Sequence, residues 1–122
     1  MKKYIFIWAP SVVWAFLILV LSISPSGHYP KVAIWYADKI AHAGIYMILA
    51  FLVFRSISHH PELPFYAKRG VFTLILCAGY GILFELIQFF VPGRDPEFGD
   101  VVANILGIIL GIVVARGIKW QK

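Results

Sequence analysis

The sequence has few charged residues and a single cysteine. Charged residues make up 14% of its 122 residues, against about 25% in an ordinary soluble domain. The cysteine, Cys77, cannot form an intramolecular disulfide, and its place in an apolar run indicates a small packing residue. The sequence also lacks internal repeats and low-complexity tracts. These absences argue against an ordinary soluble domain, a disulfide scaffold and a repeat array.

What the sequence has in excess is apolar residues, which make up 61% of it and fall in four runs. A bilayer core about 30 Å thick takes roughly 20 residues of helix to cross. Four crossings would use most of the chain and leave no room for a second, soluble domain. We therefore predict one transmembrane domain over residues 1–122, an all-α bundle of four membrane-spanning helices at about 5–23, 38–57, 71–91 and 98–118.

Prolines and glycines separate the four runs. Pro25 and Pro30 interrupt the chain after the first run, Pro61 and Pro64 after the second, and Pro92 after the third. The first run also resembles a signal peptide, with a basic start before an apolar stretch. It is long for that role, and the segment 22–25 is a poor cleavage site, so we favour a retained helix.

The basic residues predict the orientation of the bundle. With the N-terminus inside, eight of the eleven lysines and arginines lie on the inner side and three, Lys31, Lys39 and Arg94, on the outer side. Basic residues concentrate on the cytoplasmic side of membrane proteins. We therefore expect both termini in the cytoplasm, and the net charge of +5 reflects this topology rather than nucleic-acid binding.

Polar residues within the runs gather toward one side of the membrane. On three of the predicted helices they share a face at helical spacing: Asp38, His42 and Tyr46; Glu85 and Gln88; Asp100 and Asn104. His42, Glu85 and Asn104 lie about 6–9 Å inside the outer ends of their spans. Ionisable groups within a membrane span are costly and commonly functional. We therefore predict a polar pocket at the outer leaflet.

Each polar residue receives a predicted role. His42, Glu85 and Asp100 are the candidate catalytic groups, with Glu85 and His42 as an acid/base pair if there is chemistry. Arg94 and Lys39 would hold a phosphate or carboxylate. The candidate ligand-binding residues are Asp38, Lys39, Tyr46, Gln88, Arg94 and Asn104. Two alternatives stay open: a metal site of His42 with Asp38, Glu85 and Asp100, and hydrogen bonds that only join helices.

Glycines and histidines elsewhere have simpler interpretations. Gly107 and Gly111 are spaced for close helix packing, and Gly79 and Gly81 could serve the same purpose. His59 and His60 lie in a Pro-rich connection on the opposite side, where we expect them to be solvated.

Three spaced blocks resemble the VanZ-like family. The first is Asp38-Lys39 with His42 and Tyr46, the second runs from Gly81 through Glu85 and Gln88 to Arg94, and the third runs from Asp100 through Asn104 to Gly111. The family is named for a membrane protein linked to low-level teicoplanin resistance. The resemblance implies a multi-pass protein of the bacterial cytoplasmic membrane with a role in the cell envelope, but it supplies no reaction.

The sequence thus favours a site that binds or modifies a lipid or a lipid-linked cell-wall precursor, with a contribution to glycopeptide resistance. The alternatives are a small transporter or flippase, and a structural membrane protein. The expected partners are membrane lipids or the lipid-linked precursor and not nucleic acid. No cofactor is implied, and a homo-oligomer is compatible with the sequence.

Overall fold

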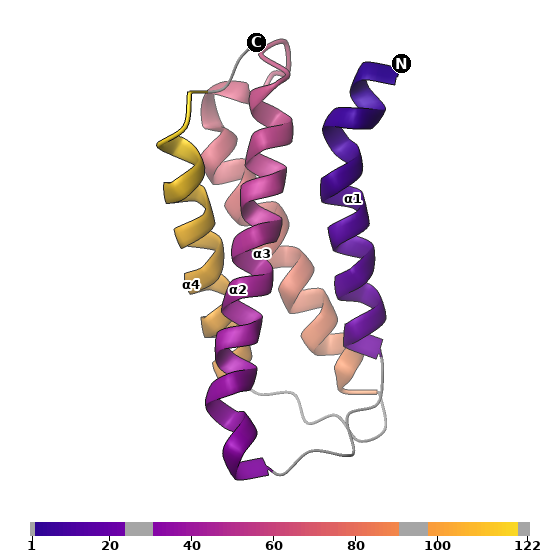
Figure 1. Cartoon of the computed structure of the whole chain (residues 1–122), viewed down its shortest axis with the longest axis vertical. Coiled ribbons are helices and arrows are strands. Elements are labelled where there is room, and N and C mark those ends of the chain that lie inside the picture. Colours follow the sequence, from indigo (N-terminus) through magenta and orange to yellow (C-terminus); the bar gives the residue numbers. More distant parts are fainter. Residues whose placement is uncertain (1, 24–30, 91–97, 120–122) are drawn as a thin grey trace.

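The computed structural model describes residues 2–23, 31–90 and 98–119, and the side chains of these except 21–23, 31–38 and 98. In this part of the chain all regular structure is helical: α1 Lys2–Ile23, α2 Lys31–Ser58, the short 3₁₀ helix η1 Tyr66–Lys68, α3 Arg69–Gln88 and α4 Phe98–Arg116. The long helices alternate in direction (Figure 1). We call the end where α2 and α4 begin the lower end and the other the upper end, as drawn in Figure 1.

Four segments are long and apolar enough to cross a membrane, which confirms the predicted class of fold. They are Lys2–Val20, Lys39–Ser58, Tyr66–Gln88 and Gly99–Arg116. Large apolar side chains such as those of Phe6 and Leu110 are exposed on the outside of the bundle. In a bilayer this apolar surface meets lipid tails, so its exposure carries none of the penalty that it would have in water.

The helix bounds differ from the predicted spans mainly at α2. This helix begins at Lys31 rather than at Asp38. No proline or glycine lies between Pro30 and Gly44, so nothing in the sequence ends the helix at the membrane boundary. The connection after α2 also contains the turn η1, where only loop was expected.

Close packing joins α2 to α4, the pair of helices with the most extensive contact. A Cβ atom on Gly107 would overlap the backbone of Ala43, and one on Gly111 would overlap the carbonyl oxygen of Met47. The predicted packing role of these two glycines is therefore confirmed. Gly79, in contrast, faces open space.

Hydrogen bonds attach α1 to the other helices. The Trp14 indole N–H donates to the carbonyl oxygen of Ile45 at 2.9 Å, and the Tyr80 hydroxyl donates to that of Ala15 at 2.5 Å. Cys77 is buried in the apolar core between the helices, as expected of a packing residue.

Candidate functional site

An ion pair joins α2 to α4 near the lower end. Lys39 lies on α2 and Asp100 in the first turn of α4, with the lysine Nζ 2.5 Å from the carboxylate Oδ1. The two side chains are only 15% and 7% exposed. A carboxylate in the first turn of a helix is also stabilised by the helix dipole. Gly99 leaves room for the lysine stem, because a Cβ there would lie 3.1 Å from Lys39 Cε.

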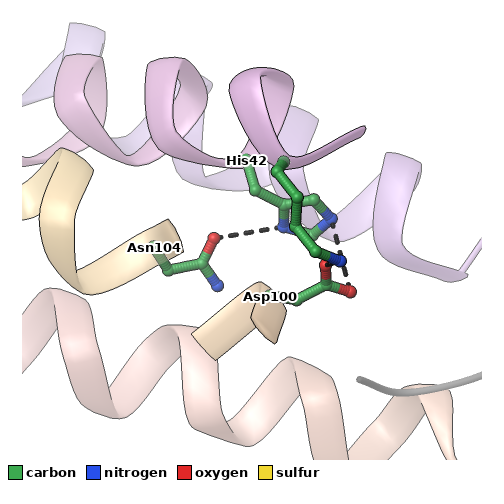
Figure 2. Close-up of polar contacts among 4 residues, drawn as sticks. His42, Asp100 and Asn104 are labelled. Atoms are coloured by element: carbon green, nitrogen blue, oxygen red, sulfur yellow. Dashed lines mark hydrogen bonds and ion pairs between the residues drawn. The ribbon is translucent and has the colours of Figure 1, made fainter. Parts of the chain in front are cut away.

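One turn further into the bundle, His42 of α2 meets Asn104 of α4. The His42 Nδ1 lies 3.1 Å from Asn104 Oδ1, and its Nε2 lies 3.9 Å from Asp100 Oδ2. Figure 2 shows the imidazole between the amide and the carboxylate. Because an amide oxygen accepts a hydrogen bond, Nδ1 carries the proton in this arrangement. Nε2 is then the ring atom without a proton, and it faces the Asp100 carboxylate.

The third helix reaches this cluster through Gly81. A Cβ on Gly81 would lie 3.2 Å from Asn104 Nδ2 and 3.3 Å from Tyr46 Cε1, so the buried Tyr46 ring and the amide meet against α3. Glu85 and Gln88 follow on the same face of α3 and are both buried. The Glu85 carboxyl lies within electrostatic reach of the Tyr46 hydroxyl.

We call Lys39, His42, Asp100 and Asn104 the α2–α4 polar cluster. The structure brings these four predicted site residues into direct polar contact. It places Tyr46 beside Asn104, and buries Glu85 and Gln88 on α3 toward the same end. The remaining predicted residues, the side chain of Asp38 and all of Arg94, lie outside the described part of the chain. The assigned roles, including the acid/base pair of Glu85 and His42, stay predictions.

The predicted metal alternative gains no ligand set from the described residues. Within residues 2–23, 31–90 and 98–119, no three or more His, Cys, Asp or Glu side chains are grouped so that they could hold an ion.

At the upper end, the expectation of solvated histidines is wrong for His60, whose side chain is buried. The Trp8 indole N–H donates to His60 Nε2 at 3.0 Å, and His60 Nδ1 lies 3.0 Å from Glu62 Oε1. The Tyr4 ring stacks on the imidazole at a centroid distance of 4.9 Å. A turn closed by Leu63 N–H and the carbonyl oxygen of His60 folds the connection back toward α1.

This arrangement also fixes the tautomer of His60 and affects the pKa of Glu62. An indole nitrogen can only donate, so His60 Nε2 accepts and its proton is on Nδ1, facing the carboxylate. The pKa of Glu62 is lowered, first by a hydrogen bond from its own backbone N–H and then by the bond with His60. Tyr4 and Trp8 lie one helical turn apart at the start of the chain, which was the available sequence signal for a partner at this end.

Sequence reasoning also missed polar contacts between α1 and α2. The hydroxyls of Ser11 and Ser56 are 2.9 Å apart, and Ser56 and Arg55 both donate to the carbonyl oxygen of Ile7 at 3.1 Å. Single serines in apolar runs give no signal of which helix they face. These contacts position α1 and hold no obvious reactive group.

Four spanning helices around a buried polar cluster define a small multi-pass membrane protein. The VanZ/LLP1 family model matches residues 4–119, and the chain belongs to this family. No curated protein and no solved structure matches the chain.

Proposed function

We propose that the α2–α4 polar cluster is the binding site for the polar head of a lipid or a lipid-linked cell-wall precursor in the bacterial cytoplasmic membrane. The observation that carries this proposal is the position of His42. It is held on Nδ1 by Asn104 and faces Asp100 through Nε2, inside a membrane-spanning segment. A histidine oriented in this way exchanges a proton at one defined atom, which suits recognition or transfer at an ionisable headgroup.

The charge of the cluster further supports a polar ligand. Lys39 contributes a cation and Asp100 an anion, and both lie near the ends of their spans, where a headgroup meets the protein. The apolar outer surfaces of the same helices would accompany the tail of such a ligand. Seven of the lysines and arginines that the structure describes belong to the upper end, so we place the cluster toward the outer leaflet.

The same contacts also support a structural role as the alternative. An ion pair and a hydrogen bond between α2 and α4 are also what would fasten two helices, at about 0.6–2 kcal/mol for each interhelical hydrogen bond. The two functions differ in what a variant loses. A fastening role predicts lower stability alone, whereas a ligand site predicts lost binding.

The test uses His42→Gln, with His59→Gln as the matched control from the upper end. We would measure binding of a purified lipid-linked cell-wall precursor by native mass spectrometry, together with thermal unfolding. We expect binding by the wild type and by His59→Gln and its loss in His42→Gln, and a new precursor mass would indicate catalysis. Equal binding by all three proteins, or no binding by the wild type with early unfolding of His42→Gln, would refute the proposal.

A cellular test addresses the proposed envelope role. We expect overexpression of the wild type in a bacterial host to raise teicoplanin resistance more than overexpression of His42→Gln at matched protein level. Equal resistance in the two strains would show that resistance does not depend on the polar cluster.

A further inference from the structure

The upper end of the bundle holds cations with few carboxylates to balance them. Lys68 and Arg69 stand at the start of α3, and Arg116 and Lys119 at and after the end of α4. Among the carboxylates that the structure describes, only Glu62 belongs to this end, and it supplies one negative charge against these four cations. The excess of positive charge is therefore local and unbalanced within the described chain.

The Arg116 guanidinium packs against Gly70 in the first turn of α3. An ideal Cβ on Gly70 would lie 2.5 Å from the Arg116 Nη2 and 3.2 Å from its Cζ, so only glycine leaves the guanidinium this place. The start of a helix carries partial positive charge. The residue before α3, Lys68, provides no side-chain cap for it. A cation on the positive end of a helix is an unfavourable pair, which an anion between or beside them would correct.

Buried hydrogen-bond donors at the same end point to an acceptor. The Thr73 hydroxyl, three residues after Gly70 on the same buried face of α3, is fully buried and has no hydrogen-bond partner among the described residues. The Ser58 hydroxyl at the end of α2 and the Nε atom of Arg69 are also buried and have no hydrogen-bond partner among the described residues. Arginine nitrogens can only donate, and buried donors are normally satisfied. Of these donors, the Thr73 hydroxyl lies one turn along the face of α3 that Arg116 contacts, and an acceptor oxygen bound there would satisfy it.

Arg69 is held in place beside this region. Its Cζ lies 4.4 Å from the Tyr66 ring centroid and 5.2 Å from that of Phe54, and its Nη1 donates to the carbonyl oxygen of Tyr66 at 3.2 Å. A guanidinium fixed by two aromatic rings loses little freedom when it binds an oxyanion.

We propose that the start of α3 and the end of α4 form a phosphate-binding site, with Arg116 and Arg69 as its main ligands and Lys68 at its rim. Its position, where the spans Tyr66–Gln88 and Gly99–Arg116 meet the membrane surface, suits the phosphate of an anionic phospholipid. The same donors would also bind free phosphate. This site lies at the end of the bundle opposite the α2–α4 polar cluster and does not depend on its function.

The sharpest test is Gly70→Ala, because it keeps every charge. The added Cβ would displace the Arg116 guanidinium, whose side chain is flexible enough to move without unfolding the bundle. The matched control is Gly79→Ala on the same helix, where a Cβ meets nothing within 4 Å. A second pair, Arg116→Gln and Lys119→Gln, removes one charge each from the same end.

Binding would be measured by native mass spectrometry with phosphatidylglycerol, phosphatidylcholine and inorganic phosphate as probes. We expect the wild type to prefer phosphatidylglycerol to phosphatidylcholine, and Gly70→Ala and Arg116→Gln to weaken that binding about tenfold, the loss of one charge-assisted contact. Gly79→Ala and Lys119→Gln should change it less than about twofold.

The phosphate probe separates the two sources. Competition by millimolar inorganic phosphate would identify a site for free phosphate, and its absence a site specific for the lipid headgroup; both support the proposal. Equal losses in Arg116→Gln and Lys119→Gln, with Gly70→Ala unchanged, would show general attraction to charge and overturn it. A wild type that binds phosphatidylglycerol no better than phosphatidylcholine, and does not bind inorganic phosphate, would overturn it as well.

Discussion

The substitution Gly107→Ala tests the dependence of the polar cluster on helix packing. The new methyl group would overlap the carbonyl oxygen and backbone of Ala43 on α2, which cannot turn aside as a flexible side chain could. To restore an ordinary carbon–oxygen contact, α2 and α4 must separate locally by about 1 Å or more. The His42–Asn104 hydrogen bond, now 3.1 Å, would then be too long to count as one.

The expected cost follows from these two losses. Overpacking a close contact costs about 1–3 kcal/mol, and an interhelical hydrogen bond adds about 0.6–2 kcal/mol. We therefore expect the free energy of unfolding to fall by about 2–5 kcal/mol, measured by detergent denaturation. The control is Gly44→Ala on α2, where a Cβ meets nothing within 4 Å and alanine should be neutral or mildly stabilising. Equal stability of the two variants would refute the close approach of α2 and α4.

Three further outcomes follow from the polar contacts. Asp100→Asn removes the carboxylate that pairs with the largely buried Lys39 and should lower the free energy of unfolding by about 2–3 kcal/mol. The loss is smaller than for a deep ion pair because the lysine can extend toward water, and a double-mutant cycle with Lys39→Met measures the pairing. Trp8→Phe removes the donor to His60 and should cost about 1 kcal/mol in the same assay, whereas an unchanged value would show that the bond adds nothing. Because the pKa of Glu62 is lowered from 4.5, its contribution to stability is present above that pH and is lost as the pH falls through the lowered pKa; Glu62→Gln should flatten this part of the unfolding profile.

The predicted class of fold rested on features that act locally along the chain. Apolar runs of spanning length and the prolines between them are sufficient to predict four helices, because a bilayer requires each crossing to satisfy its own backbone hydrogen bonds. The spacing of Gly107 and Gly111 likewise predicted a close helix contact, which the structure confirms. The start of α2 was misplaced because the membrane limits a span but does not end a helix.

Only the tertiary structure decided which side chains contact one another. Helical spacing put His42 and Asn104 on inward faces, but their contact depends on how closely α2 approaches α4, which the glycines of one helix and the backbone of the other set together. The burial of His60 shows the same limit, since His60 lies in the connection after α2 and its partner Trp8 lies 52 residues away on α1. For the polar residues of the spans, the sequence by itself determined which side chains share a helix face, because helical period is a local property. Which of them touch was determined by packing, because contacts between helices depend on the shapes of both surfaces at once.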